Sequence, residues 1–431
     1  MKRANRLGIA FLALLALLTA LALAGELEHD WLGFPTEHLV VHFWRGGANP
    51  GRFEQVDGLN PYLQLLARGA QRLEEDFQLV AGFLGLDYDP ATLGRVYVFI
   101  YPDLESYQEA SGCLICAASV GGFIAPLWDE EVAAGVRHHE ISPLVVYLTL
   151  ASPARVILHE FTHVLDFSLI DNRPPTFLLE GLADYTSYRL DEVPDEWELD
   201  RADQFVALFA AERGFDLYAD YFVNSGYWKF TYEVGTSFIR FLVDRDKGGW
   251  ERFLSFYSSL HLPTDRTTLD RLFQEHYGAD LATLEAEWRA HLAKVEITAN
   301  ARAFYDFRMD QVLIRYIFLR PLFKDPDQAE ALFEEARHLH QGVLDLEAAE
   351  ALRAYLKLGN LTIDPERAAR AWAYAQYLRS YVYSYHRDRP ELVQEFSKGY
   401  TELGQHYTRG EWSEFLRLYW ELIDRYVTWR V

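Results

Sequence analysis

The feature that most constrains the fold is a change of hydrophobic period near residue 152. Before this point, short runs of β-branched and aromatic residues flank one amphipathic helix, predicted over residues 59–86. After it, nearly all apolar residues recur at helical spacing. The predicted strands are Leu39–Trp44, Val96–Tyr101, Gly121–Trp128 and Leu144–Leu150. This order predicts an α+β fold, in which a small sheet with its helices is followed by an all-helical region.

The N-terminus has the pattern of an export signal. Basic residues among the first six precede an uncharged apolar run over residues 7–24, and Ala22–Ala24 fits a small-x-small cleavage site. The mature chain is therefore expected to begin near Gly25, in a secreted or cell-envelope protein. The run has the length of a minimal membrane span, so an uncleaved membrane tether is the alternative.

Length, composition and charge limit the classes of protein. The chain has 431 residues, half of them hydrophobic and 15% aromatic, which is typical of folded domains rather than disorder. Its net charge is −23, and removal of the three positive charges in the signal makes it −26. Such a charge argues against nucleic acid or an anionic membrane surface as partner, because both would repel it.

The only two cysteines, Cys113 and Cys116, form a CxxC pair. Two thiolates are half of a zinc site, and the glycine-rich sequence that follows is not the helix of a thioredoxin-type motif. A local disulfide in an oxidising compartment is the favoured interpretation.

The stretch "ILHEFTHVLDF", residues 157–167, carries two histidines four residues apart. Ser152 and Pro153 precede it as a good N-cap and first helical residue, so a helix from Pro153 to about 167 is predicted. On that helix His159 and His163 share one face and can reach one metal ion. Glu160 is rotated by about 100° on a helix of 3.6 residues per turn, and is better placed to take a proton from a zinc-activated water than to bind the metal. A helix with two satisfied histidines is the simpler alternative.

A second acidic pair follows in "RPPTFLLEGLADYTSY". A helix is predicted from Thr176, and it places Glu180 and Asp184 one turn apart on one face. Because the surrounding residues are apolar, these carboxylates need partners. Zinc suits Glu180, and Asp184 suits the free ring N–H of a ligating histidine. A third histidine at the metzincin spacing would fall at position 169, which is Leu169, so that class is excluded.

HEFTH followed by "PPTFLLEGLADY" resembles the gluzincin zinc metallopeptidases, most closely the exported peptidase MA-like family. Phe177 stands where that family usually has tryptophan, and Leu179 where asparagine is common. The resemblance covers about residues 36–295 and is specific only at the metal motifs. It implies a zincin-like fold and hydrolysis of peptide or protein substrates.

The resemblance also implies roles for single residues. His159, His163 and Glu180 are the expected zinc ligands, Glu160 the general base and Asp184 the partner of a ligating histidine. Gluzincins also use a tyrosine or histidine to stabilise the oxyanion, and Tyr232 is the candidate here.

A substrate-binding edge strand is expected at "GGFIAP", from Gly121 and Gly122 through Phe123 to Pro126. The glycines permit close approach of another backbone, and Pro126 cannot donate to a central ladder. A plain buried strand has the same sequence pattern.

Residues 300–431 carry no recognisable motif and are predicted to form helical hairpins, with breaks near Gly359 and Gly410. The predicted organisation is thus a signal over 1–24, a metallopeptidase domain over 25–295 and a helical C-terminal domain over 300–431. The function expected is an exported zinc metallopeptidase. The alternative is a non-catalytic exported binding or scaffold protein with a vestigial or structural zinc site.

Overall fold

The computed structural model describes residues 31–44, 61–101, 123–126, 144–149, 154–170, 174–191, 196–223, 230–244, 249–261, 265–340, 345–386 and 389–427. The chain forms two compact units. The first comprises the described residues within 1–112, 120–172 and 183–194, and the second those within 173–182 and 195–431. The expected signal over 1–24 lies outside the described residues, and the division into domains at residues 25–295 and 300–431 stays a prediction.

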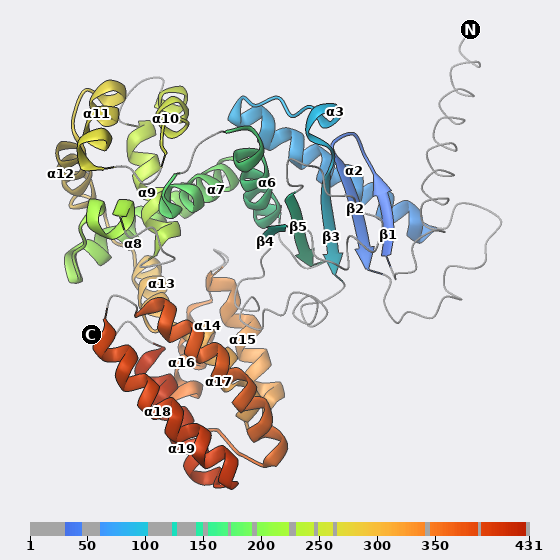
Figure 1. Cartoon of the computed structure of the whole chain (residues 1–431), viewed down its shortest axis with the longest axis vertical. Helices are drawn as coiled ribbons and strands as arrows, with labels where there is room; N and C mark the ends of the chain where they lie inside the picture. The colour runs from blue at the N-terminus through green and yellow to red at the C-terminus, as the bar shows by residue number, and fades with distance from the viewer. Residues whose placement is uncertain are drawn as a thin grey trace. The chain divides into compact units, whose positions relative to one another are not determined.

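The first unit contains a five-stranded mixed sheet of order β1-β2-β3-β5-β4 (Figure 1). Strands β2, β3 and β5 are parallel to one another, whereas β1 and β4 run antiparallel to their neighbours β2 and β5. The strands are β1 Trp31–Pro35, β2 Leu39–Trp44, β3 Val96–Tyr101, β4 Phe123–Pro126 and β5 Leu144–Thr149. Two of the predicted strands have these bounds, β4 and β5 begin or end within the predicted ranges, and β1 was not predicted.

One face of the sheet is aliphatic. Val41, Val98 and Val146 are register partners across β2, β3 and β5, and all three are fully buried. Two helices pack against the sheet and against each other: α2 contacts β1 and β2, and α6 contacts β4 and β5. The first unit also contains a short helix, and its helices are α2 Pro61–Leu84, α3 Pro90–Leu93 and α6 Ala154–Leu169.

The two helices that support the sheet meet through aromatic rings. Phe77 of α2 and Phe161 of α6 are both fully buried, and their rings contact edge to face at 5.3 Å. Phe161 lies between the two histidines of the HEFTH motif, on the side of α6 that faces α2. The hydrophobic core of the first unit therefore holds the metal-motif helix by its apolar side.

The second unit is built from helices alone among its described residues. Each helix contacts the next along most of the chain, as in α8 with α9, α15 with α16, and α18 with both α17 and α19. Its elements are α8 Glu196–Glu212, a π-helical turn η2 Leu217–Val223, α9 Thr231–Asp244, α10 Gly249–Tyr257, α11 Arg266–Tyr277, α12 Leu281–Leu292, α13 Ala299–Met309, α14 Val312–Leu319, the 3-10 turn η3 Arg320–Leu322, α15 Pro326–His340, α16 Leu346–Lys357, α17 Pro365–Tyr385, α18 Pro390–Arg409 and α19 Trp412–Tyr426. Helix α7, Thr176–Leu190, contributes its first half to this unit and its second half to the first unit.

Local sequence signals set many of these helix ends. Several helices begin at a side chain that accepts a backbone N–H, as at Asp265, Asp280, Thr298, Asp345 and Asp364. Helix α18 ends at Gly410, which adopts the left-handed conformation with φ of 70°. The break near Gly359 falls between α16 and α17, and that near Gly410 between α18 and α19, so both predicted breaks are confirmed. No described helix combines the length and the apolar character that crossing a membrane requires.

Candidate metal centre

Helix α7 starts where the two prolines predict. The carbonyl of Pro175 accepts the backbone N–H groups of Leu178 and Leu179, so the first turn forms directly after the Pro174–Pro175 pair. The N-cap predicted for α6 at Ser152 and Pro153 lies outside the described residues, and α6 begins at Ala154. Both motif helices thus exist with close to their predicted bounds.

A hydrogen bond joins the two helices. Nδ1 of His159 on α6 donates to Oδ1 of Asp184 on α7 at 2.8 Å. Because Nδ1 is then the protonated nitrogen of a neutral ring, Nε2 of His159 keeps its lone pair for a metal or for another donor. The contact is half-buried, since the side chains of His159 and Asp184 are 13% and 17% exposed.

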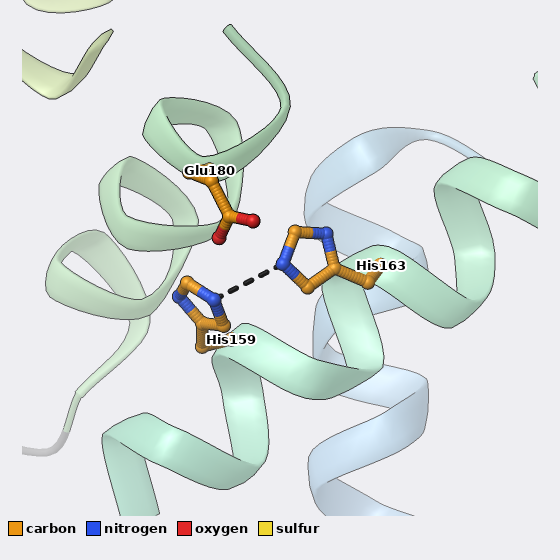
Figure 2. A group of neighbouring side chains, drawn as sticks. All are labelled: His159, His163 and Glu180. Atoms are coloured by element: carbon orange, nitrogen blue, oxygen red, sulfur yellow. Dashed lines mark hydrogen bonds between the residues drawn. The ribbon is translucent and has the colours of Figure 1, made fainter. Parts of the chain in front are cut away.

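Three potential ligands meet beside this contact. His159, His163 and Glu180 each offer one ligand atom, and these atoms all lie within 4.8 Å of one another. Figure 2 shows the Glu180 carboxylate, one turn before Asp184 on α7, directed toward the space between the two imidazole rings. His163 and Glu180 are buried, and the group is therefore a buried His-His-Glu arrangement that could hold a metal ion.

The geometry of the two histidines fits a metal. Their Nε2 atoms are 3.1 Å apart and their rings are almost perpendicular, at 83°. Two imidazole nitrogens bound to one tetrahedral zinc at about 2.0–2.1 Å are about 3.3 Å apart. Two imidazole nitrogens and one carboxylate are a donor set that zinc accepts, and iron(II) accepts the same set. The residues present therefore fit a divalent metal, and zinc is one that they suit.

Glu160 follows the first histidine and is buried, with 6% of its surface exposed. It is outside the group of three converging ligand atoms. Another acidic residue of the same helix, Asp166, is also buried, at 1% exposure. Since α6 is regular through this stretch, Glu160 keeps the angular offset from His159 and His163 that its sequence position predicts.

The first half of α7 is held in the second unit by a backbone contact with α9. A Cβ added at Gly235 would stand 1.8 Å from the carbonyl oxygen of Phe177, and one at Gly181 would stand 2.4 Å from the carbonyl carbon of Gly235. Phe177 itself is buried against Tyr221, Phe222 and Phe238. Gly181 directly follows Glu180, so this crossing fixes the backbone from which Glu180 projects.

Tyr232, the candidate oxyanion residue, lies in the first turn of α9 and is half-buried. It precedes Gly235 by three residues, which places it on the turn adjacent to the crossing with α7. Its catalytic role stays a prediction.

The remaining sequence expectations concern the sheet and the cysteines. Phe123 begins β4, which is the last strand in the order of described strands. Gly121, Gly122, Cys113 and Cys116 lie outside the described residues.

Two residues near the centre were not singled out in the sequence. Tyr188, on α7, donates its hydroxyl to Oδ2 of Asp184 at 3.3 Å. Phe167 of α6 stacks on the ring of His163 although it is 54% exposed. The sequence signal for the contact of Tyr188 with Asp184 was their i, i+4 spacing in "DYTSY".

No protein-family model, no curated protein and no solved structure matches this chain.

Proposed function

We propose that this protein is an exported zinc-dependent metallopeptidase of the gluzincin type, similar to the peptidase MA-like family. The observation that carries the proposal is the convergence of His159, His163 and Glu180, which come from two helices and bring their ligand atoms within 4.8 Å of one another. A divalent metal would compensate the charge of a buried carboxylate that lies beside two imidazoles.

The composition of the centre favours a catalytic over a structural metal. Structural zinc sites have four protein ligands, whereas catalytic sites have three and keep one position open. Among the described residues the group has three members. A buried glutamate, Glu160, directly follows the first ligand, which is where a general base is needed in a catalytic site.

The residues of the chain then have separate tasks. Bound zinc supplies Lewis acidity, which lowers the pKa of an attacking water and polarises a peptide carbonyl. Asp184 holds the ring of His159 in the tautomer that presents Nε2. Glu160 accepts the proton of the attacking water and delivers it to the leaving amine. Tyr232 donates to the oxygen of the tetrahedral oxyanion.

The substrate peptide is proposed to add to the sheet at β4. This strand is antiparallel to β5 and has no further neighbour among the described strands, and α6 packs against it. Strand addition gives affinity through backbone hydrogen bonds with little sequence preference. A peptide bound there runs along the strand that contacts the metal-motif helix.

The experiment that tests the function compares zinc content and peptide hydrolysis in three proteins. Parent protein is expected to carry about one zinc per chain and to cleave an unstructured protein substrate such as casein. Glu160→Gln is expected to keep the zinc and to lose activity by about 100-fold or more, as for loss of a general base. Glu350→Gln, an exposed position on α16, is the matched control and should behave as the parent.

The outcomes separate the candidate functions. A parent without zinc after reconstitution overturns the metal assignment. If the parent binds zinc but hydrolyses the substrate no faster than Glu160→Gln does, Glu160 is structural and not a general base, and the non-catalytic scaffold with a structural zinc becomes the better account.

A further inference from the structure

We propose that Tyr188 is a positioning residue of the metal centre: its hydroxyl orients the Asp184 carboxylate, and through it the ligand His159. The inference rests on the proposed function only in requiring that the centre binds a metal. Its starting point is a chain of two hydrogen bonds in the first unit. Tyr188 donates to Oδ2 of Asp184 at 3.3 Å, and His159 donates from Nδ1 to Oδ1 of the same carboxylate at 2.8 Å.

The two bonds use different oxygens of one carboxylate. The Cβ–Cγ torsion of aspartate is a broad sp³–sp² torsion, so a carboxylate held at a single oxygen can rotate away from its partner. A second donor on the other oxygen removes that freedom. The tyrosine can act in this way because it lies one helical turn after Asp184 on α7 and shares its face.

Solvent makes the second bond consequential. The Asp184 side chain is 17% exposed and that of His159 is 13% exposed, so water can compete for the carboxylate. A tyrosine hydroxyl fixed by the helix competes better than a mobile water, because its ordering occurs when the helix folds. The neighbouring Ser187 does not contribute to this, since its hydroxyl donates to the backbone carbonyl of Asp184 rather than to the carboxylate.

The expected effect is on metal affinity. Loss of the direct partner of a ligating histidine weakens metal binding about 10- to 100-fold. Tyr188 acts one bond further out, so Tyr188→Phe is expected to raise the zinc dissociation constant by about threefold to tenfold. The phenyl ring remains in Tyr188→Phe, so ring packing is retained and the fold of the metal-free protein should be unchanged.

A double-mutant cycle tests the mechanism. Zinc affinity is measured on the full chain by competition with a chromogenic chelator, for the parent, Tyr188→Phe, Asp184→Ala and the double variant. If Tyr188 acts through Asp184, its substitution has no effect once Asp184 is alanine. Tyr383→Phe is the matched control. It removes an exposed tyrosine hydroxyl that is hydrogen-bonded to Ser397, between α17 and α18. The zinc affinity of this variant should equal that of the parent.

Each outcome decides the proposal. Equal zinc affinity in Tyr188→Phe and the parent overturns the proposal. The proposal is also overturned if Tyr188→Phe weakens zinc binding as much in the Asp184→Ala background as in the parent, because the tyrosine would then act through the fold. If Asp184→Ala does not fold, Asp184→Ser takes its place in the cycle. A parent that binds no zinc overturns both this inference and the proposed function, whereas a zinc-binding, hydrolytic parent with no Tyr188 effect overturns this inference alone.

Discussion

The crossing of α7 and α9 is the contact that a single methyl group tests most directly. At Gly235 an added Cβ would stand 1.8 Å from the carbonyl oxygen of Phe177 and 2.9 Å from Cα of Gly181. The smallest ordinary distance between such a carbon and a carbonyl oxygen is about 3.3 Å, so the substitution Gly235→Ala requires about 1.5 Å of separation. The obstacle is backbone, which cannot rotate away as a side chain can.

The expected cost exceeds the gain in helix propensity. Alanine in place of glycine within a helix stabilises by about 1 kcal/mol. Overpacking a close contact costs about 1–3 kcal/mol, and the rigid obstacle at this site places the cost at the upper end. We therefore expect Gly235→Ala to lower the free energy of unfolding by about 2 kcal/mol.

The same displacement acts on the metal centre. Glu180 directly precedes Gly181 on α7, and metal–ligand distances tolerate shifts of only about 0.2 Å. A movement of the helix by more than 1 Å is thus expected to weaken zinc binding by about tenfold or more. Stability is measured by urea unfolding followed by tryptophan fluorescence, and zinc affinity by chelator competition.

Two glycines provide graded controls. A Cβ at Gly82 in α2 meets nothing within 4 Å, so Gly82→Ala should stabilise slightly and leave zinc binding unchanged. At Gly399 it meets only the flexible end of Leu422 at 2.8 Å, and an intermediate stability is expected. If Gly235→Ala is as stable as Gly82→Ala and binds zinc like the parent, the helix crossing is not close-packed and the reasoning is refuted.

Two further predictions concern the sheet and the metal. His42 is buried on β2 with neither ring nitrogen hydrogen-bonded among the described residues, and burial lowers its pKa to about 4. Below pH 6.5 His42 therefore takes up a proton in the unfolded chain but not in the folded chain. The free energy of unfolding should fall by about 2 kcal/mol between pH 7.5 and 5. His42→Phe should remove that part of the pH dependence, and an unchanged profile would show that other groups cause it. Zinc at about 100 times its dissociation constant should stabilise the parent by about 2.7 kcal/mol in thermal or urea unfolding, and a chelator should reverse this; a stabilisation of the same size in His163→Ala would place the zinc elsewhere.

Features that depend on neighbours along the chain could be predicted from the sequence. Histidines at i and i+4 lie on one face of any helix, so His159 and His163 had to point the same way once α6 was helical. The same holds for Glu180 and Asp184 on α7. The Pro174–Pro175 pair determined where α7 begins, and apolar periodicity located β2, β3 and α2 because it reports burial directly.

Other features could not be predicted from the sequence, because they depend on partners that are distant along the chain. Strand β1, with the sequence WLGFP, has a glycine and a proline and no alternation, and it is a strand because β2 offers it a ladder. The strand order, with β4 at one end and β5 next to β3, follows from which edges remain available after folding. No local signal specifies either.

The candidate centre shows the same division. Residue types and helical spacing predicted the two pairs, His159 with His163 and Glu180 with Asp184. The pairs lie 17 residues or more apart in the sequence, and nothing local requires them to meet. The hydrogen bond from His159 to Asp184 joins the two helices, and the contact of Gly181 with Gly235 fixes the backbone next to Glu180. The sequence by itself therefore determined the faces that the two helices present, because side-chain direction on a helix is a local property. Only the tertiary structure decided the distance between those faces, because that distance depends on packing against elements far away in the chain.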